Sequence, residues 1–210
     1  MKNSLFVLAG YLIVCTACTN ELENSNKIYF YTQDSLYKIS FDKPIELDTF
    51  YSWLDYDDNA CSDEHKYRFS KKNFPPQKET GFFWTSYADS TYRITVKHVE
   101  KFNCKLNMDY EKIVTPEEYK QRLLKKAEYD HKPIKITYIK EIKIDNKQFL
   151  LSAYRVDEKY KNGYWTDYIK ASTIVDSNMI VFTADCRANN CKEFIGRMEK
   201  TLKTIKIEKE

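Results

Sequence analysis

The first 18 residues constrain the chain more than any other feature. Lys2 is the only charge before an apolar run from Leu5 to Val14, and small residues follow that run. A basic start, a short apolar core and small residues at a cleavage point make up a secretory signal. The run is much shorter than the ~20 apolar residues of a transmembrane helix. We therefore expect residues 1–17 to be a signal peptide outside the fold, with a buried helix or an uncleaved anchor as the alternatives.

The end of this segment resembles a bacterial lipoprotein signal, in which a small residue precedes an obligatory cysteine. Ala17 and Cys18 fit that pattern, whereas Cys15 stands where Leu or Val is usual. The resemblance implies that Cys18 is the first mature residue and carries acyl chains, which would anchor the protein permanently to a membrane of the cell envelope. Residues 18–26 are expected to be a polar tether, and residues 27–210 a single domain. The resemblance leaves the membrane and its side open.

Four further cysteines predict two disulfides, because an even number of thiols in an exported chain favours pairing. Three pairings of Cys61, Cys104, Cys186 and Cys191 are possible. We favour Cys61–Cys104 and Cys186–Cys191, since only four residues separate the last two at an expected strand-to-helix turn. The closer C-x-x-C spacing of redox proteins is absent.

The composition excludes several function classes. The chain has 34 Lys and Arg against 31 Asp and Glu, which indicates neither a nucleic-acid binder nor a strongly acidic partner. Only Gly81, Gly163 and Gly196 follow the signal, too few for a phosphate-binding loop, a dinucleotide fingerprint or a G-x-S-x-G nucleophile elbow. No cofactor is expected.

Hydrophobic periodicity predicts an α+β domain with an antiparallel sheet that helices cover. An N-terminal hairpin is expected over 27–42, and a further hairpin over 81–99 that turns at Ala88-Asp89-Ser90. Thr115-Pro116-Glu117-Glu118 predicts a capped helix reaching Tyr129. A four-stranded meander follows, with a bulge near Ile139 and turns at Asp145-Asn146 and Ser177-Asn178. A last helix is expected from Cys191 to Lys203.

From about Arg68 onward, this order of elements resembles the Mog1/PsbP-like α/β/α fold. The likeness rests on Thr115-Pro116-Glu117-Glu118-Tyr119, on the strand pairs around Asn146 and Ser177-Asn178, and on residues 198–205. It implies an α/β/α sandwich with the 27–42 hairpin as an addition. Since the family is mostly a non-enzymatic binding scaffold, the resemblance implies no catalytic residues.

The histidines give no local sign of a catalytic or metal site. His65, His98 and His131 each stand alone, without an H-E-x-x-H or H-x-H pair. We therefore predict that the chain is not an enzyme. The alternative is an envelope hydrolase with a non-standard site of Asp and His residues.

Two segments are the expected partner-binding surfaces of a membrane-tethered binding protein. The hairpin tip around Tyr160, Tyr164 and Trp165 mixes aromatic residues with lysines, a composition typical of protein interfaces. The acidic loop from Asp55 to Glu64, with Asp57 and Asp58, is expected to add a charge-dependent contact; calcium binding and a plain solvated loop are the other interpretations. The expected partner is an envelope protein or a small ligand, with toxin neutralisation by an immunity protein as one form of this function.

Overall fold

The computed structural model describes residues 25–32, 34–55, 64–71, 91–99, 114–158, 164–187 and 191–210, which form two antiparallel sheets and two helices. The seven-stranded sheet has the order β3 (Thr49–Asp55), β4 (Glu64–Ser70), β5 (Thr91–Val99), β9 (Asn178–Arg187), β8 (Tyr164–Val175), β7 (Lys147–Glu158) and β6 (Ile134–Ile144). The three-stranded sheet has the order β1 (Ser25–Tyr31), β2 (Tyr37–Pro44) and β10 (Lys206–Lys209). The helices are α1 (Pro116–Tyr129) and α2 (Cys191–Leu202).

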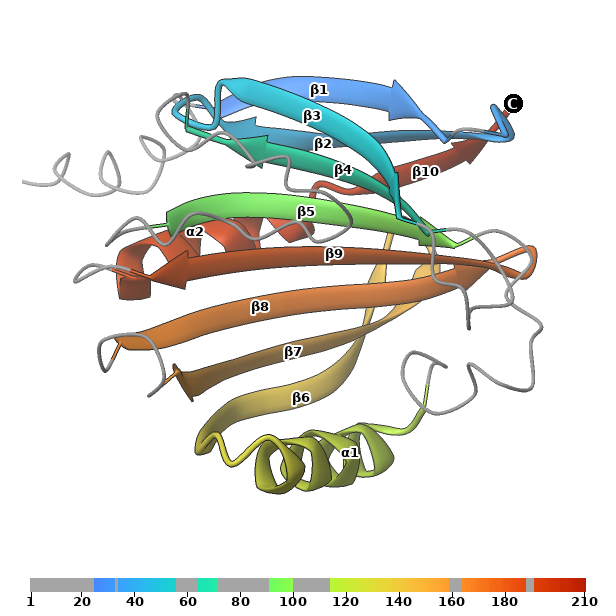
Figure 1. Cartoon of the computed structure of the whole chain (residues 1–210). Helices are drawn as coiled ribbons and strands as arrows, with labels where there is room; N and C mark the ends of the chain where they lie inside the picture. Colours follow the sequence, from blue (N-terminus) through green and yellow to red (C-terminus); the bar gives the residue numbers. More distant parts are fainter. Residues whose placement is uncertain are drawn as a thin grey trace, which may run out of the picture.

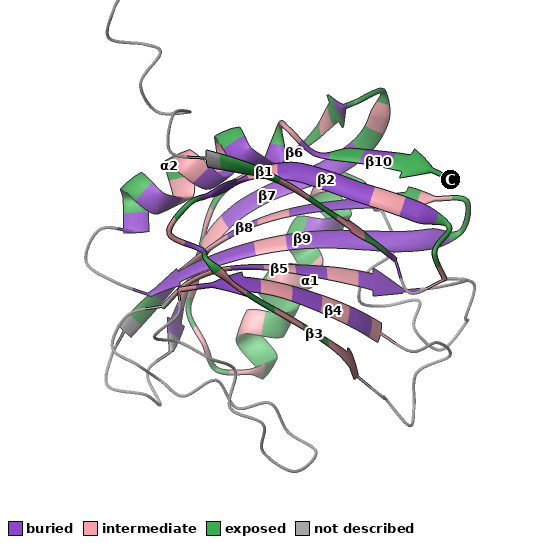
Figure 2. Ribbon diagram, turned by 90° about the horizontal axis from the view of Figure 1, so that it is seen from above, coloured by how far each residue is buried: buried purple, intermediate pink, exposed green. Residues whose placement is uncertain are grey.

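The core lies between the seven-stranded sheet and a layer made of the three-stranded sheet and α2 (Figures 1 and 2). We call the sheet face toward this layer the inner face and the opposite one the outer face. Phe41 of β2 joins the layers, because its ring lies 5.5 Å from that of Phe69 and 5.7 Å from that of Phe182. Strand β9 is buried over nearly its whole length and is the middle strand of the seven-stranded sheet.

Helix α1 forms where its capping box predicts. The Thr115 hydroxyl accepts a hydrogen bond from the Glu118 amide, and the Glu118 carboxylate accepts one from the Thr115 amide. Tyr119 is the only residue of the helix that is fully buried, and it packs with Leu150 of β7 on the outer face. The helix therefore covers only the β6–β7 side of this face, as Figure 1 shows.

The expected antiparallel α+β class is confirmed, and the expected covering by helices is confirmed only in part. Helix α2 contacts β8, β9 and β2, but most of the inner face is covered by a second sheet. The 27–42 hairpin supplies two strands of that sheet. Its third strand, β10, pairs with β2 far along the chain, Lys206 lying opposite Ser40.

Within the meander, the structure confirms one predicted turn and corrects the positions of the bulge and of the other turn. The bulge lies at Thr137 and not near Ile139. Because of this extra residue, Tyr138 and the residues that alternate with it toward Ile144 face the inner core, whereas Ile136 is on the outer face. Asp145 and Asn146 both have positive φ, as a two-residue hairpin turn requires. The next turn is formed by Asp176 and Ser177, one residue before the predicted pair.

Candidate functional site

An aromatic cleft opens where an edge of the smaller sheet meets an edge of the larger one. Among the described strands, β1 and β3 are each at the end of their sheet. The Phe30 ring of β1 lies 4.4 Å from the ring of Tyr67 and 6.5 Å from that of Phe50, which joins the two edges. Phe50 and Tyr31 remain 49% and 45% exposed at this seam. We define the aromatic cleft as Phe30, Tyr31, Phe50, Ser52, Leu54, His65 and Tyr67.

A pocket of about 280 Å³ lies in the cleft. Its lining consists of Tyr31, Ser52, Trp53, Leu54, His65, Lys66 and Tyr67. Ser52 lies opposite Tyr67 and Leu54 opposite His65, so these four side chains share the inner face. Because side chains alternate along a strand, those of Trp53 and Lys66 project from the outer face. The small Ser52 side chain leaves space between Phe50 and Leu54, and Tyr31 borders that space from the other sheet.

Two histidines meet behind this pocket. His65 of β4 lies directly opposite His98 of β5, and both are on the inner face, where they are 8% and 0% exposed. Neither ring nitrogen of His98 has a hydrogen-bond partner of normal geometry among the described residues, but the Asn178 side chain is close enough for a weak hydrogen bond. Burial lowers the pKa of His98, the nearby Asp34 carboxylate opposes that shift, His65 adds to it, and the weak hydrogen bond with Asn178 raises the pKa slightly. Burial therefore favours the neutral imidazole form of His98.

Polar contacts fix the hairpin tip above the histidines. The Asp34 carboxylate accepts hydrogen bonds from the Thr32 hydroxyl and, at 3.1 Å, from the Leu36 amide. The Tyr37 hydroxyl donates to Asp176 at 3.1 Å and accepts from Asn178 at 3.4 Å. Burial is the main cause of the raised pKa of Tyr37. These bonds tie the β1–β2 hairpin to the β8–β9 turn and so hold the pocket wall in place.

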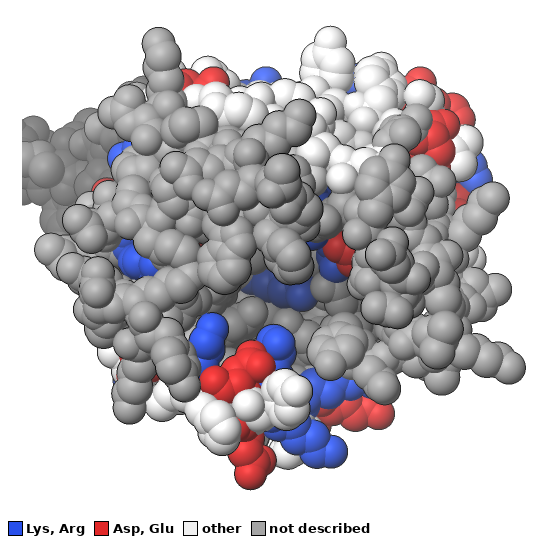
Figure 3. Space-filling model, viewed as in Figure 1, with Lys and Arg blue, Asp and Glu red and all other residues white. Residues whose placement is uncertain are grey.

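The outer face carries most of the charged side chains of the sheet. Figure 3 shows blue Lys and Arg atoms at the bottom of a hollow above α1. Arg93 pairs with Asp185 and Lys97 with Glu64, and the Arg68 guanidinium lies 4.8 Å from the Trp53 ring centroid. Burial, with repulsion from Arg93, lowers the pKa of Arg68 to about 10, and Asp185 opposes that shift. These contacts join residues of the sheet to one another, so we assign this network to stability.

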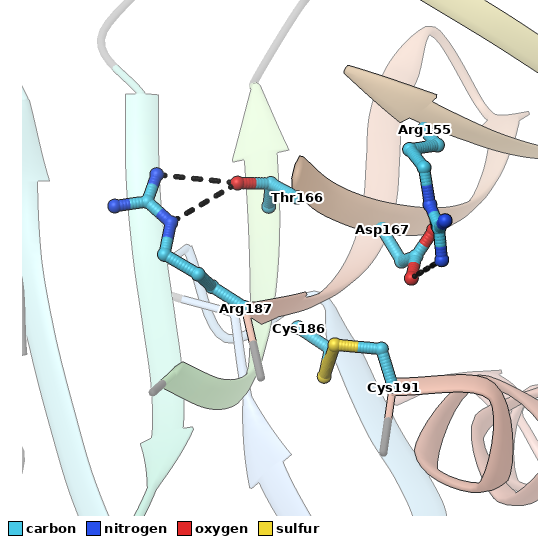
Figure 4. Close-up of a disulfide and its surroundings, with 6 residues drawn as sticks. All are labelled: Arg155, Thr166, Asp167, Cys186, Arg187 and Cys191. Atoms are coloured by element: carbon cyan, nitrogen blue, oxygen red, sulfur yellow. Dashed lines mark hydrogen bonds and ion pairs between the residues drawn. A yellow bond between two sulfur atoms is a disulfide. The ribbon is translucent and has the colours of Figure 1, made fainter. Parts of the chain in front are cut away.

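The predicted Cys186–Cys191 disulfide is confirmed. It joins the end of β9 to the start of α2, and Figure 4 shows it beside the Arg187–Thr166 contact and the Arg155–Asp167 ion pair. Cys18, Cys61 and Cys104 lie outside the described residues, so the anchor and the second disulfide stay predictions. No helix in the described ranges is long and apolar enough to cross a membrane.

The two predicted partner-binding segments lie at opposite ends of the sheet. Trp165, at the start of β8, is 39% exposed. Asp55, at the end of β3, pairs with Glu64, which pairs with Val99, which pairs with Met179. Met179 in turn pairs with Ile174, so the end of β3 is level with Ile174 of β8. Nine residues of β8 separate these ends, about 30 Å at the usual strand rise. Tyr160, Asp57 and Asp58 lie outside the described residues, as do the side chains of Tyr164 and Asp55. The described strand ends beside the two segments therefore lie apart, and binding by either segment stays a prediction.

The cleft itself was missed from the sequence, although two signals were present. Tyr29-Phe30-Tyr31 and Phe50-Tyr51-Ser52-Trp53 are dense in aromatic residues, which alternate between the two faces of edge strands. The histidine pair had no local signal, because 33 positions separate His65 from His98 and only the β4–β5 register joins them.

Comparison with known proteins supports the fold. No protein family and no curated protein matches the sequence. The structure is similar to that of cyanobacterial PsbP (CyanoP) from Synechocystis sp. PCC 6803, with a TM-score of 0.52 and 10% identity over 95% of this chain and 100% of that one. A protein of unknown function from Pseudomonas aeruginosa aligns with a TM-score of 0.43 and 10% identity, over 85% of this chain and 94% of that one. The first similarity supports the PsbP-like part of the expected fold; identity this low shows the fold alone.

Proposed function

We propose that this protein is a lipid-anchored, non-catalytic lipoprotein of the bacterial cell envelope that binds a protein partner in the aromatic cleft. The observation that carries the proposal is the exposure of large aromatic side chains at the mouth of a pocket. Tyr31 and Phe50 are 45% and 49% exposed there, and Tyr29, which is 66% exposed, makes an edge contact with Tyr31. Aromatic residues are enriched in the buried centres of protein interfaces, where they fill pockets on the partner.

A protein partner fits this site better than a free small molecule does. The pocket volume of about 280 Å³ falls just below the usual range of roughly 300–1,000 Å³ for ligand pockets. It suits one or two side chains, and the exposed rings beside it extend the contact area. Lys38 lies over the Tyr29 ring at 5.1 Å, so the rim also carries positive charge. A partner that presents an apolar side chain flanked by acidic residues matches these features.

The position of the cleft in the chain agrees with tethering. Strand β1 starts at Ser25, seven residues after Cys18. Seven extended residues span at most about 25 Å, so an acylated Cys18 would keep β1 close to the membrane surface. The partner is accordingly expected to be a membrane-associated or membrane-proximal protein of the envelope.

Changing Cys18 to Ser tests the anchor. The variant should lose metabolic palmitate labelling and leave the membrane fraction or stay unprocessed, because the thioether has no acceptor. Cys15→Ser is the matched control and should label as the wild type does. Equal labelling of the Cys18→Ser variant would refute the anchor.

Changing Phe50 to Ala tests the binding surface. A photo-crosslinking residue placed at Tyr31 in intact cells should give a defined adduct, and Phe50→Ala should lower its yield at least tenfold, as expected for an interface hot spot of about 2 kcal/mol. The same crosslinker at Tyr129, which is 85% exposed on α1, is the control and should give none.

The adduct separates the cleft from the other surfaces considered. A yield that falls with Trp165→Ala and not with Phe50→Ala would instead place binding at the β7–β8 hairpin tip. The hydrolase alternative has one geometric argument, since Ser52 lies diagonally across from His65 on the inner face. Ester or peptide turnover that disappears with His65→Ala would contradict a non-catalytic function.

A further inference from the structure

We propose that His65 and His98 form a two-histidine site for a divalent transition-metal ion of the imidazole-preferring kind, such as Zn²⁺. The inference goes beyond the proposed partner-binding function and does not depend on it. It rests on the pairing of the two residues, on the burial of the His98 ring without a hydrogen-bond partner of normal geometry among the described residues, and on the access that the pocket gives to His65.

The sheet register places both imidazoles within reach of one ion. Residues directly opposite each other on antiparallel strands have Cβ atoms about 4.5–5.5 Å apart on the same face. His65 and His98 are such a pair on the inner face of β4 and β5. Two imidazoles on Cβ atoms at this spacing can both approach an ion at the usual zinc–nitrogen distance of about 2.0–2.1 Å.

A bound metal ion would explain why the ring nitrogens of His98 are buried without a hydrogen-bond partner of normal geometry among the described residues. The residue is 0% exposed, and neither Nδ1 nor Nε2 has a hydrogen-bond partner of normal geometry within the described part of the chain. Leaving a buried polar group unpaired costs about 1–3 kcal/mol, so such groups in folded proteins mark bound ions, ordered water or functional sites. A metal ion would use one of these nitrogens directly.

The surroundings suit a neutral ligand set and a positive ion. Metal ligation requires the unprotonated imidazole, and burial favours that form of His98. Asp34 is close enough to place negative potential on the ring, and hydrogen bonds from Thr32 and Leu36 hold its carboxylate. Lys66 also lines the pocket, but the strand alternation sends its ammonium to the outer face, where it pairs with Glu64.

The site would be open on the pocket side. Among the described residues, no third His, Cys, Asp or Glu completes a group of metal ligands. Water, or a group that enters the pocket, would therefore fill the remaining positions, as in zinc sites that keep an exchangeable ligand. An ion held by β4 and β5 together would also cross-link two neighbouring strands.

Zinc titration of the full-length protein in detergent at pH 7.5 tests the site. We expect one equivalent of Zn²⁺ to bind with a micromolar Kd, and His65→Asn and His98→Asn each to weaken it at least tenfold. His131→Asn should not change it, because His131 is the third histidine of the chain and follows α1. Binding should weaken as pH falls below about 6, since protons then compete for the imidazoles.

Two further measurements distinguish loss of a ligand from loss of the fold. His65→Cys keeps a zinc ligand at the more accessible position, so it should retain binding that His65→Asn loses. With Cu²⁺ as the probe, electron paramagnetic resonance should show two coupled nitrogens in the wild type and one in His65→Asn. The proposal is overturned if the wild type binds no Zn²⁺ at 1 mM, or if binding is unchanged in both Asn variants.

Discussion

The Phe41→Ala variant is expected to lose about 3–5 kcal/mol of unfolding free energy, the range measured for truncating a buried Phe. Phe41 is 1% exposed and is one of the largest fully buried side chains. Its ring makes edge contacts with Phe69 of β4 and Phe182 of β9, so one side chain joins the smaller sheet to the larger one. Removing it leaves a cavity between the layers that rigid neighbouring strands cannot close.

Urea denaturation followed by circular dichroism measures this loss. For a domain of this size the melting temperature should also fall by on the order of 10 °C. Phe50→Ala is the matched control: Phe50 is 49% exposed, so the same truncation should change the unfolding free energy much less. Equal losses in the two variants would mean that the layers are not held together through Phe41.

The Asp185→Asn variant should lose about 2–3 kcal/mol through the outer face of the sheet. Asp185 is 4% exposed, and both its carboxylate oxygens lie 2.7 Å from Nε of Arg93. Asn keeps the size of the side chain but removes the negative charge that offsets the repulsion between Arg93 and the half-buried Arg68. Removing one member of a buried pair costs about 3–5 kcal/mol, and the partial exposure of Arg93 reduces the expected loss.

Asp176→Asn controls for the loss of a carboxylate as such. Asp176 pairs with Lys209 at 2.7 Å, but both side chains are more than half exposed, and exposed pairs contribute about 0–1 kcal/mol. The amide oxygen of Asn can still accept the hydrogen bond that the Tyr37 hydroxyl donates to Asp176. Its φ of 47° suits Asn as well as Asp. A loss for Asp185→Asn no larger than for Asp176→Asn would show that the outer-face network does not stabilise the fold.

Local sequence signals predicted the elements that are stabilised by interactions between residues close together in the sequence. The capping box at Thr115 and Glu118 placed α1, because both hydrogen bonds form within four residues. The short spacing of Cys186 and Cys191 placed a disulfide, and alternating hydrophobic residues placed the strands of the meander.

Features set by distant pairing could not be predicted in this way. Strand β10 has four residues, three of them charged, and becomes a strand only because β2 offers it an edge. Strand β3 lacks regular hydrophobic alternation, and β4 alternates charged residues with His65, Tyr67 and Phe69; the places of both in the sheet are set by pairing with each other and with β5. The same dependence on register hid the His65–His98 pair, and with it the inner part of the candidate site.

The pairing of β10 with β2 also sets the order in which the molecule can fold. The β1–β2 hairpin is made early in synthesis, but its sheet gains the third strand only when residues roughly 160 positions downstream arrive. Long sequence separations of this kind slow folding, since the entropy of closing the loop is lost before the contact forms. Until then one edge of β2 keeps the unpaired backbone groups that β10 later takes up. Residues 206–209 thus complete the smaller sheet late in synthesis. A nascent chain that stalls before them would expose an aggregation-prone surface that chaperones would have to protect.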